Sequence, residues 1–583
     1  KVDVWSWTDQ RMMTQQLKEL KDDKQFTLRT VYNLKDEKFT VLGAKDMNNP
    51  SIGMEGDAPF VLRSDVLKYY KERSWNTPGR ADYYYVNVET GEEKLLLEAF
   101  RGQVHLSPAG KWVVYYCYAD SCWYSMNPVT LEKKNLTSEI DDLFYNDEHD
   151  TPTPAGSFWL AGWTEKDASV LINAKYDIWK IDPSGKNAPM NITAALNKPQ
   201  TEKRIIDTES HKYYISEKEN ILMNIFDDES KDDGFAVYNL KKNRFYNQIT
   251  GPYKYRYAGK SENSTEILYR KMSYADYAQL YICDMELNAE TQLSDANQLQ
   301  DDYYWGTVRH ISYVSYNGDS LQGLLYLPEK YTQGVRMPMI VYFYETYSDN
   351  IHQYYTPGPS RSVISFPFYN SNGYAVFIPD IVYREGYPGQ SAYDCIMAGV
   401  DQVLEDYPFI DENRMGIQGQ SWGGYQVAWL VTRTDRFVAA MAGAPVSNMT
   451  SAYGGIRWSS GMVREFQYER TQSRIGDNLW NAFDLYVENS PLFGVPNIET
   501  PLLIMSNDGD GAVPWYQGIE FFTALRRLDK PAWLLNYNSD AHNLMKWPNR
   551  VDLSKRMFEF FEHYLKGKDM PEWMEFGVPA IEK

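Results

Sequence analysis

The chain is poor in cysteine, histidine and positive charge, and each shortage argues against a class of protein. Its 583 residues include only 4 Cys and 7 His, with no Cys/His spacing typical of zinc, no HExxH and no phosphate loop. The 59 basic side chains are outnumbered by 79 acidic ones, and the formal charge of -20 would repel nucleic-acid phosphates. We therefore expect no metal, no cofactor and no nucleic-acid partner.

Long hydrophobic runs are lacking as well. A membrane helix needs about 20 consecutive apolar residues, whereas apolar stretches such as PMIVYFY and PAWLLNY have the length of a strand. No signal-peptide pattern is present, but KVDVWSWTDQ does not begin as a domain normally does. We expect an export signal and part of the first domain to precede Lys1, with the protein in the periplasm or outside the cell; a cytoplasmic location stays open.

The four cysteines are too few for a disulfide framework. Cys117 and Cys122 bracket YADS and could face each other across a hairpin, either bridged or as two free thiols. Cys283 and Cys395 have the surroundings of buried apolar residues.

The first half of the chain is strand-like. Aromatics make up 15% of the residues, with 47 Tyr and 17 Trp, and between about 45 and 300 short strands alternate with turns. An aromatic strand, an Asn or Asp and a turn recur every 40 to 57 residues, at Asn87, Asn127, Asp182, Asn239 and Asp284. This loose period is typical of four-stranded propeller blades. We predict a β-propeller over 1–305, incomplete at its N-terminus, with an all-β sandwich as the alternative.

After Trp305 the pattern changes to strands alternating with helices. Strands are predicted at 337–344, 374–380, 414–419 and 501–506. A closing helix at 552–567 has one apolar stripe, formed by Leu553, Met557, Phe560, Phe561, Tyr564 and Leu565. Residues 306–583 are therefore predicted to form a second domain with a doubly wound α/β sheet.

The stretch GQSWGGYQ, residues 419–426, carries the strongest functional signal. Its context RMGIQGQSWGGYQVAWLV predicts a strand, a sharp turn and a helix. Gly419-x-Ser421-x-Gly423 then fits a nucleophile elbow, in which small neighbours let strand and helix pack behind a strained serine. Trp422 can be large because its side chain points away while its N–H serves an oxyanion hole.

An α/β-hydrolase serine requires an acid and then a histidine, each after a later strand. Only His542 and His563 follow Ser421, and His563 lies within the closing helix. His542 follows the strand AWLLNY in a polar loop, as required. The loop NDGDGAVP lies between serine and histidine and offers Asp508 and Asp510 as acids.

A calcium loop is a rival interpretation of this acidic stretch. Its first and twelfth positions would be Ser506 and Gln517, where carboxylates are required. The sequence therefore favours a triad acid.

Together these motifs resemble the prolyl oligopeptidase family of serine peptidases, above all its dipeptidyl peptidase IV and acylaminoacyl-peptidase branches. The resemblance rests on GQSWGGYQ, NDGDGAVP, DAHN and PMIVYFYE; it covers 306–567 and is diffuse over the first half. It implies a propeller that lies over an α/β-hydrolase site and limits substrates to short peptides. By this resemblance Asp510 corresponds to the family's acid and Tyr344 to its oxyanion tyrosine. A strand-end core residue is the alternative for Tyr344.

Two stretches depart from the family pattern. Glu345-Thr346-Tyr347 stands where the family has Gly-Gly-Pro after its tyrosine, and Ser506-Asn507 stands where it has His-Gly before the acid loop. Both departures concern the geometry of the loops rather than the chemistry.

The sequence thus predicts a serine peptidase with the triad Ser421, Asp510 and His542, and with an oxyanion hole made by the Tyr344 hydroxyl and the Trp422 N–H. It is expected to be dipeptidyl-peptidase-like or an oligopeptidase. An esterase using the same triad and an inactive propeller-based binding protein are the alternatives. Short peptides are the expected partners, and a homodimer is compatible with the sequence.

A substrate pocket is predicted at Met449, Ala452 and Arg457. In proline-specific relatives aromatic side chains stand where Met449 and Ala452 lie, so we predict broad or non-proline preference. Arg457 would bind a carboxylate of the substrate. The alternative is an ion pair between Arg457 and an acidic residue of the propeller.

Overall fold

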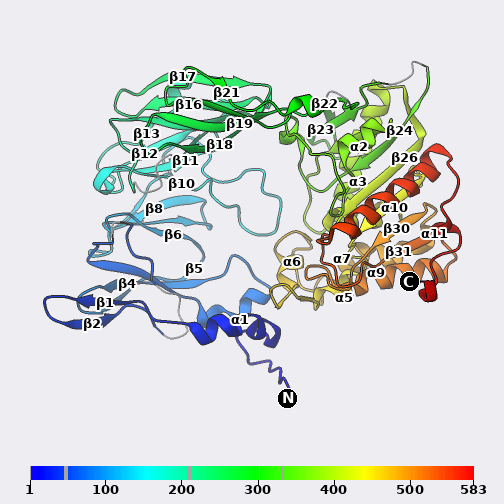
Figure 1. Cartoon of the computed structure of the whole chain (residues 1–583). Helices are drawn as coiled ribbons and strands as arrows, with labels where there is room; N and C mark the ends of the chain where they lie inside the picture. The colour runs from blue at the N-terminus through cyan, green and yellow to red at the C-terminus, as the bar shows by residue number, and fades with distance from the viewer. Residues whose placement is uncertain are drawn as a thin grey trace.

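The computed structural model describes residues 2–44, 50–54, 56–206, 213–300, 303–330 and 334–582. The chain forms two lobes: an N-terminal lobe of small sheets and a C-terminal lobe in which helices cover one large sheet (Figure 1). Within the described ranges, no helix has both the length and the apolar character needed to cross a bilayer.

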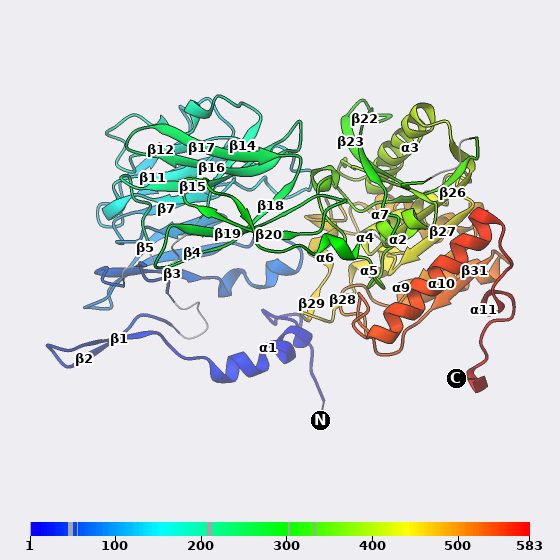
Figure 2. The ribbon, with the colours of Figure 1, turned by 45° about the horizontal axis from the view of Figure 1, so that its top comes forward.

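In the described part of the N-terminal lobe, one three-stranded and four four-stranded antiparallel sheets follow one another along the chain (Figure 2). Helix α1 (Met13–Gln25) and the hairpin β1 (Thr30–Asn33) and β2 (Lys38–Val41) precede them. The sheets comprise β3 (Phe60–Asp65), β4 (Ala81–Asn87) and β5 (Glu93–Phe100); β6 (Gly102–Leu106), β7 (Val113–Cys117), β8 (Cys122–Met126) and β9 (Lys133–Asn135); β10 (Leu160–Trp163), β11 (Val170–Asn173), β12 (Ile178–Ile181) and β13 (Met190–Asn191); β14 (Thr201–Ile205), β15 (Asn220–Asp227), β16 (Asp233–Asn239) and β17 (Arg244–Gly251); and β18 (Lys254–Lys260), β19 (Glu266–Met272), β20 (Gln279–Asp284) and β21 (Thr291–Gln292).

The strand–Asn/Asp–turn repeat has a structural cause. Each predicted Asn or Asp ends, or directly follows, the next-to-last strand of its sheet. There its side chain accepts hydrogen bonds from the turn that follows: Asn87 Oδ1 binds the N–H groups of Glu89 and Thr90, and Asn127 Oδ1 those of Val129 and Thr130. Such Asx turns reverse the chain, and after Asn87 and Asp182 a glycine of positive φ, Gly91 or Gly185, completes the turn. The repeat is confirmed, and the separate small sheets exclude the two-sheet sandwich.

The cysteines take up the predicted environments. Cys117 and Cys122 lie directly opposite each other across the β7–β8 hairpin, and both carry free thiols. Cys283 and Cys395 are buried, at 2% and 1% exposure.

The C-terminal lobe is built on an eight-stranded sheet in the order β22-β23-β25-β24-β26-β27-β30-β31, antiparallel at β22–β23–β25 and parallel from β25 onwards. Its strands are β22 (Thr307–Val314), β23 (Ser320–Leu327), β24 (Met337–Tyr342), β25 (Ala375–Pro379), β26 (Ile410–Gln420), β27 (Ala439–Gly443), β30 (Leu502–Met505) and β31 (Ala532–Leu535), and β28 (Ile456–Arg457) pairs with β29 (Met462–Val463) as a separate hairpin. The four predicted strands correspond to β24, β25, β26 and β30, and are confirmed.

Helices cover both faces of this sheet. One hydrophobic core includes α3, α4 and α9, and the other includes α2 and α10. The helices are α2 (Phe366–Ser371), α3 (Pro388–Asp406), α4 (Trp422–Leu430), α5 (Met449–Tyr453), α6 (Glu465–Glu469), α7 (Phe483–Glu488), α8 (Pro491–Gly494), α9 (Tyr516–Arg527), α10 (Trp547–Lys566) and α11 (Glu572–Glu575). The apolar stripe predicted for the closing helix is the buried face of α10, with Tyr564 at its partly buried margin.

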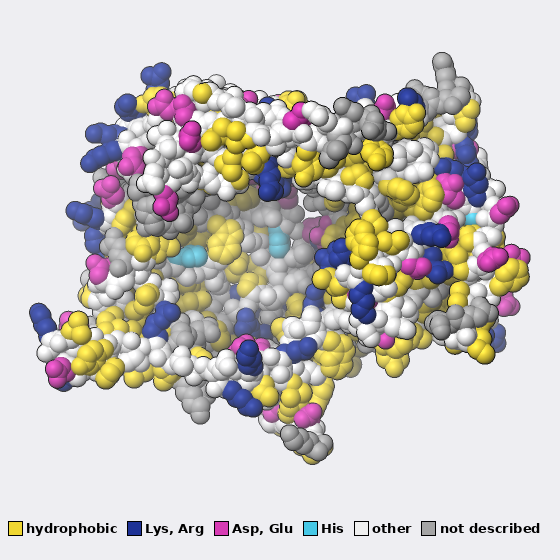
Figure 3. Space-filling model, viewed as in Figure 1, with side chains coloured by type: hydrophobic (Ala, Val, Ile, Leu, Met, Phe, Trp, Pro, Cys, Tyr) yellow, Lys and Arg dark blue, Asp and Glu magenta, His cyan; other side chains and the backbone are white. Residues whose placement is uncertain are grey.

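Polar contacts join the lobes around a hollow that opens between them (Figure 3). On the N-terminal side Thr14 Oγ1 donates to the carbonyl of Gly461 at 2.5 Å. At another point of the boundary, Lys231 Nζ lies 2.8 Å from Asp349 Oδ1. The lobes are therefore connected at more than one point.

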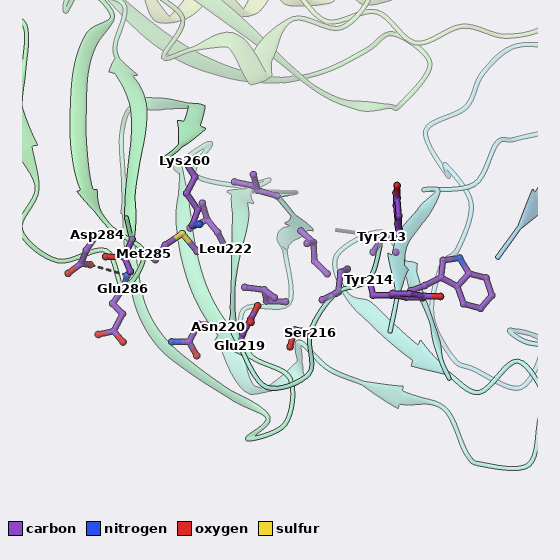
Figure 4. Close-up of a pocket in the computed structure, with 18 of the residues that line it drawn as sticks. Tyr213, Tyr214, Ser216, Glu219, Asn220, Leu222, Lys260, Asp284, Met285 and Glu286 are labelled. Atoms are coloured by element: carbon purple, nitrogen blue, oxygen red, sulfur yellow. Dashed lines mark hydrogen bonds between the residues drawn. The ribbon is translucent and has the colours of Figure 1, made fainter. Parts of the chain in front are cut away.

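A cavity of about 750 Å³ lies within the N-terminal lobe. Its wall comes from strands of three successive sheets and includes the side chains of Tyr214, Leu222 and Lys260 (Figure 4). None of the predicted site residues lines this cavity.

Candidate active site

Ser421 lies at the turn between β26 and α4. Its backbone has φ +62° and ψ -113°, a conformation that non-glycine residues rarely adopt. Its N–H donates to the carbonyl of Gly443 on the neighbouring strand β27 at 2.8 Å, which holds the turn against the sheet. The strained serine is the geometry predicted for a nucleophile elbow.

The glycines around Ser421 are required by close backbone contacts. A Cβ on Gly419 would lie 2.3 Å from the carbonyl oxygen of Gly423, and one on Gly423 would lie 2.5 Å from that of Phe343. A Cβ on Gly424 would lie 2.1 Å from the carbonyl oxygen of Gly443. No side chain fits at these positions, because the obstacles are backbone atoms.

Trp422 is the first residue of α4, and its side chain points into the core. The indole is 3% exposed, stacks on Tyr425 at 4.5 Å between ring centroids, and donates from Nε1 to the Tyr383 hydroxyl at 3.0 Å. Its backbone N–H belongs to the first turn of the helix and has no acceptor within it. This N–H is therefore free of the helix ladder, as an oxyanion donor must be.

Asp510 and His542 form a close pair on the loops after β30 and β31. His542 Nδ1 lies 2.6 Å from Asp510 Oδ2, and the aspartate side chain is 1% exposed. Asp510 Oδ1 accepts the N–H groups of Ala512 and Val513 at 2.7 and 2.9 Å, which fixes the carboxylate plane. Because β26, β30 and β31 are parallel, their carboxyl ends bring Ser421, Asp510 and His542 to the same edge of the sheet.

A set of polar side chains holds the acid and histidine loops together. Asp508 Oδ1 accepts the N–H of Ser539, and Asn507 Nδ2 donates to the carbonyl of Ala541 at 2.8 Å. The side chain of Gln420 donates to the carbonyl of His542 at 2.8 Å, which ties the elbow to the histidine loop. Asp508 is thus a loop-bridging residue, distinct from Asp510.

Tyr344 lies two residues beyond β24 at the same edge of the sheet and is partly exposed. Its carbonyl accepts hydrogen bonds from the Tyr383 hydroxyl and from Gln426 Nε2, both at 3.1 Å. Its own hydroxyl accepts from Gln472 Nε2 at 3.2 Å. Its backbone and its hydroxyl are both held, as a pre-organised donor requires.

The predicted pocket residues differ in their surroundings. Met449 and Ala452 belong to the hydrophobic core of this lobe, with 0% and 1% exposure. Arg457 is half-buried: burial and the neighbouring Arg464 lower the pKa of its guanidinium, while Asp510 and Tyr344 act in the opposite sense. Arg457 makes no ion pair among the residues described. It thus lies within electrostatic reach of both Asp510 and Tyr344.

Arg464 is a second arginine near this position, and no motif in the sequence singles it out. It is 1% exposed, and its Nη1 donates to the carbonyl of Ala512 in the acid loop at 2.6 Å. Its Nε and Nη2 are buried without a hydrogen-bond partner in the part of the chain that the structure describes. The Arg464 guanidinium also lies over the ring of Tyr468, 6.0 Å from the ring centre.

Part of the C-terminal lobe is similar in sequence to a known family. Residues 367–568 match the profile of the prolyl oligopeptidase family. This part of the C-terminal lobe is therefore similar to a domain of this family. The family is one of serine peptidases, and its matched region contains Ser421, Asp510 and His542.

The sequence matches to known relatives cover only part of this chain and part of each relative. The chain is 28% identical over 277 residues to the uncharacterized peptidase YuxL of Bacillus subtilis, a match covering 46% of this chain and 40% of that protein. It is 23% identical over 344 residues to dipeptidyl-peptidase 5 of Porphyromonas endodontalis, covering 53% and 45%. The chain thus spans less than half the length of these relatives.

A solved structure extends the fold likeness over nearly the whole chain. The puromycin-hydrolyzing peptidase of Mycobacterium tuberculosis superposes with a TM-score of 0.59 at 15% identity, covering 92% of this chain and 84% of that one. At this identity the likeness concerns the fold alone.

Proposed function

We propose that the protein is a serine peptidase that hydrolyses short peptides through Ser421, Asp510 and His542. The observation that carries the proposal is the 2.6 Å contact between Asp510 and His542 on the same sheet edge as a strained serine. The family match and the names of relatives, a peptidase and a dipeptidyl-peptidase, support a dipeptidyl-peptidase-like or oligopeptidase activity.

In the proposed reaction His542 Nε2 takes the proton of the Ser421 hydroxyl as Ser421 Oγ attacks the peptide carbonyl. Asp510 keeps the proton of the imidazole on Nδ1 and stabilises the imidazolium. The Tyr344 hydroxyl and the Trp422 N–H donate to the oxyanion of the tetrahedral intermediate. The C–N bond then breaks, and the amine leaves with the proton held by His542.

Water completes the cycle. His542 takes a proton from a water molecule, whose oxygen attacks the acyl carbon of the ester on Ser421. The second tetrahedral intermediate collapses, the serine regains its proton from His542, and the acid product leaves. No metal or redox group enters this scheme.

The architecture proposed for this enzyme has two domains, with a boundary near residue 305. The small antiparallel sheets of 1–305 would form a β-propeller, and 306–583 the α/β-hydrolase domain. The hollow between the lobes (Figure 3) supports access of a substrate from solvent to the boundary between them. We further propose that the protein is exported.

A fluorophosphonate probe combined with paired substrates tests the proposal. We expect the probe to label Ser421, and we expect hydrolysis of peptide substrates to exceed that of matched esters relative to their uncatalysed rates. Hydrolysis of esters alone would favour the esterase alternative. A chain that is not labelled would favour the inactive binding protein.

Arg457 is proposed to select substrates that carry a carboxylate, either on the side chain before the cleaved bond or at a C-terminus. Because a charge-assisted hydrogen bond contributes about 1.5–3 kcal/mol, Arg457→Ala should lower kcat/KM for such peptides by roughly 10- to 100-fold. Neutral peptides should change by less than about threefold. A series of short peptides that differ only at this residue measures the effect.

Arg526→Ala is the matched control, because Arg526 lies exposed on α9. A preference that Arg457→Ala leaves intact, or strong proline selectivity in the parent, would mean that other residues form the pocket.

A further inference from the structure

Arg474 is an almost fully buried cation at the boundary between the lobes. Its side chain is 4% exposed, and its Nη2 lies 2.6 Å from Asp150 Oδ1. Its Nε also donates to Asp150 Oδ1, at 3.1 Å, and to the Asp150 carbonyl, at 3.2 Å. Asp150 lies 324 residues upstream, on the loop between β9 and β10 of the N-terminal lobe. A residue of one lobe thus holds the guanidinium of the other by three hydrogen bonds.

The same aspartate also holds Tyr383. Asp150 Oδ2 accepts the N–H of Tyr383 at 3.1 Å, and the guanidinium carbon of Arg474 lies 3.9 Å from the centre of the Tyr383 ring. Burial lowers the pKa of Arg474, but Tyr383, Asp150 and Glu345 outweigh it and raise the pKa above its usual value. The cation is therefore held charged, in contact with the tyrosine.

Hydrogen bonds connect both Tyr383 and Arg474 to Tyr344. The buried Tyr383 hydroxyl donates to the Tyr344 carbonyl at 3.1 Å and itself accepts from Trp422 Nε1. Arg474 Nη1 donates to the carbonyl of Gln472 at 2.8 Å, and the side chain of Gln472 donates to the Tyr344 hydroxyl at 3.2 Å.

Arg474 also contacts the residue that follows Tyr344. Its Nη1 lies 3.3 Å from Glu345 Oε1. Arg474 is therefore linked to Tyr344 in three ways. Tyr383 connects it to the Tyr344 carbonyl, Gln472 connects it to the Tyr344 hydroxyl, and Glu345 is the next residue in the chain. A group held at several points loses little entropy when it later donates a hydrogen bond.

We propose that Asp150 of the N-terminal lobe is a positioning residue for the oxyanion hole, acting through Arg474 and Tyr383 on Tyr344. The inference rests on the proposed function, since it assigns a purpose to Tyr344 in the same reaction. The N-terminal lobe then contributes to catalysis in addition to any role in limiting access to the site. Asp150 would thereby stabilise the tetrahedral intermediate, because the Tyr344 hydroxyl donates a hydrogen bond to the negative charge that develops on its oxygen.

Asp150→Asn tests the proposal, because the amide keeps an acceptor for Tyr383 but removes the charge facing Arg474. Removal of a whole oxyanion donor costs roughly 10²- to 10³-fold in kcat; misplacing one should lower kcat by about tenfold, with KM nearly unchanged. The affinity for a peptidyl boronate, which forms a tetrahedral adduct with the serine, should fall by a similar factor. Affinity for the product peptide should stay constant.

A double-mutant cycle with Tyr344→Phe separates positioning from simple support of the fold. In the Tyr344→Phe background, Asp150→Asn should no longer change kcat, whereas any effect on Tm should persist. Lys231→Gln is the control, because it breaks another ion pair between the lobes, with Asp349; it should leave kcat unchanged. Arg474→Lys, which keeps the charge but not the fork, provides a second variant and should resemble Asp150→Asn.

Equal losses of kcat from Asp150→Asn in both backgrounds, or a loss of Tm alone, would overturn the proposal. So would a Tyr344→Phe variant as active as the parent, although Ser421 would then still be the nucleophile. The rate of fluorophosphonate labelling follows the same oxyanion hole without peptide turnover. It therefore tests the Asp150 route even if the parent cleaves no peptide, an outcome that would contradict the proposed function instead.

Discussion

Ser421→Ala should reduce peptide hydrolysis by roughly 10⁴-fold or more, the loss expected when the nucleophile of a triad is removed. The fold should be retained, because alanine is smaller than serine and the Ser421 N–H bond to Gly443 does not involve the side chain. Steady-state turnover of a short peptide and the unfolding temperature, measured on the same preparation, give both results.

Ser371→Ala is a suitable control, since Ser371 is exposed at the end of α2. Its turnover should equal that of the parent. A Ser421→Ala variant within tenfold of the parent would end the assignment of Ser421 as the nucleophile.

Asp510→Asn should cost about 10⁴-fold in kcat, because an amide no longer holds the imidazole of His542 in the tautomer that accepts the serine proton. Asp508→Asn should cost less than about threefold. Its side chain accepts one N–H, from Ser539, and an amide oxygen can accept that bond equally well.

Comparing kcat of the two variants is decisive, because both remove one negative charge from the same loop. If Asp508→Asn were the inactive variant, the assignment of the acid would be wrong, and the 2.6 Å pair of Asp510 with His542 would be structural.

The elbow and the order of acid and histidine could be predicted because local patterns fix them. The need for glycine at the elbow arises from contacts with residues nearby in the chain and on neighbouring strands. The acid and histidine loops could be located because each comes directly after a strand that is recognisable in the sequence as an apolar run. Strand β27, with the sequence AAMAG, was missed because it lacks the branched and aromatic residues typical of strands.

The support around Tyr344 could not be predicted from the sequence. Tyr383 and Gln472 contact Tyr344, and Asp150 contacts Tyr383, only because the fold brings them together. Nothing near these residues along the chain indicates these contacts. The pocket prediction had the same weakness. Met449 and Ala452 follow the elbow helix along the chain, but their burial in the core depends on how α5 packs.

The two departures from the family pattern have structural counterparts. Glu345 lies at the end of the Asp150–Arg474 chain of charges, so a side chain is used where the family has glycine. Asn507 joins the acid loop to the histidine loop, donating to Ala541 and accepting from the N–H of Tyr537 at 3.0 Å. Both substitutions add contacts that hold the site.

The three glycines at the elbow limit how this chain can change over generations. A Cβ on Gly419, Gly423 or Gly424 would lie within 2.5 Å of a backbone carbonyl oxygen. A side chain at any of these positions would therefore clash with the backbone, and one further substitution elsewhere could not remove the clash. Arg457, which is half-buried, carries no such restriction. New substrate preferences can therefore arise by single steps in the pocket, while the serine turn is inherited unchanged.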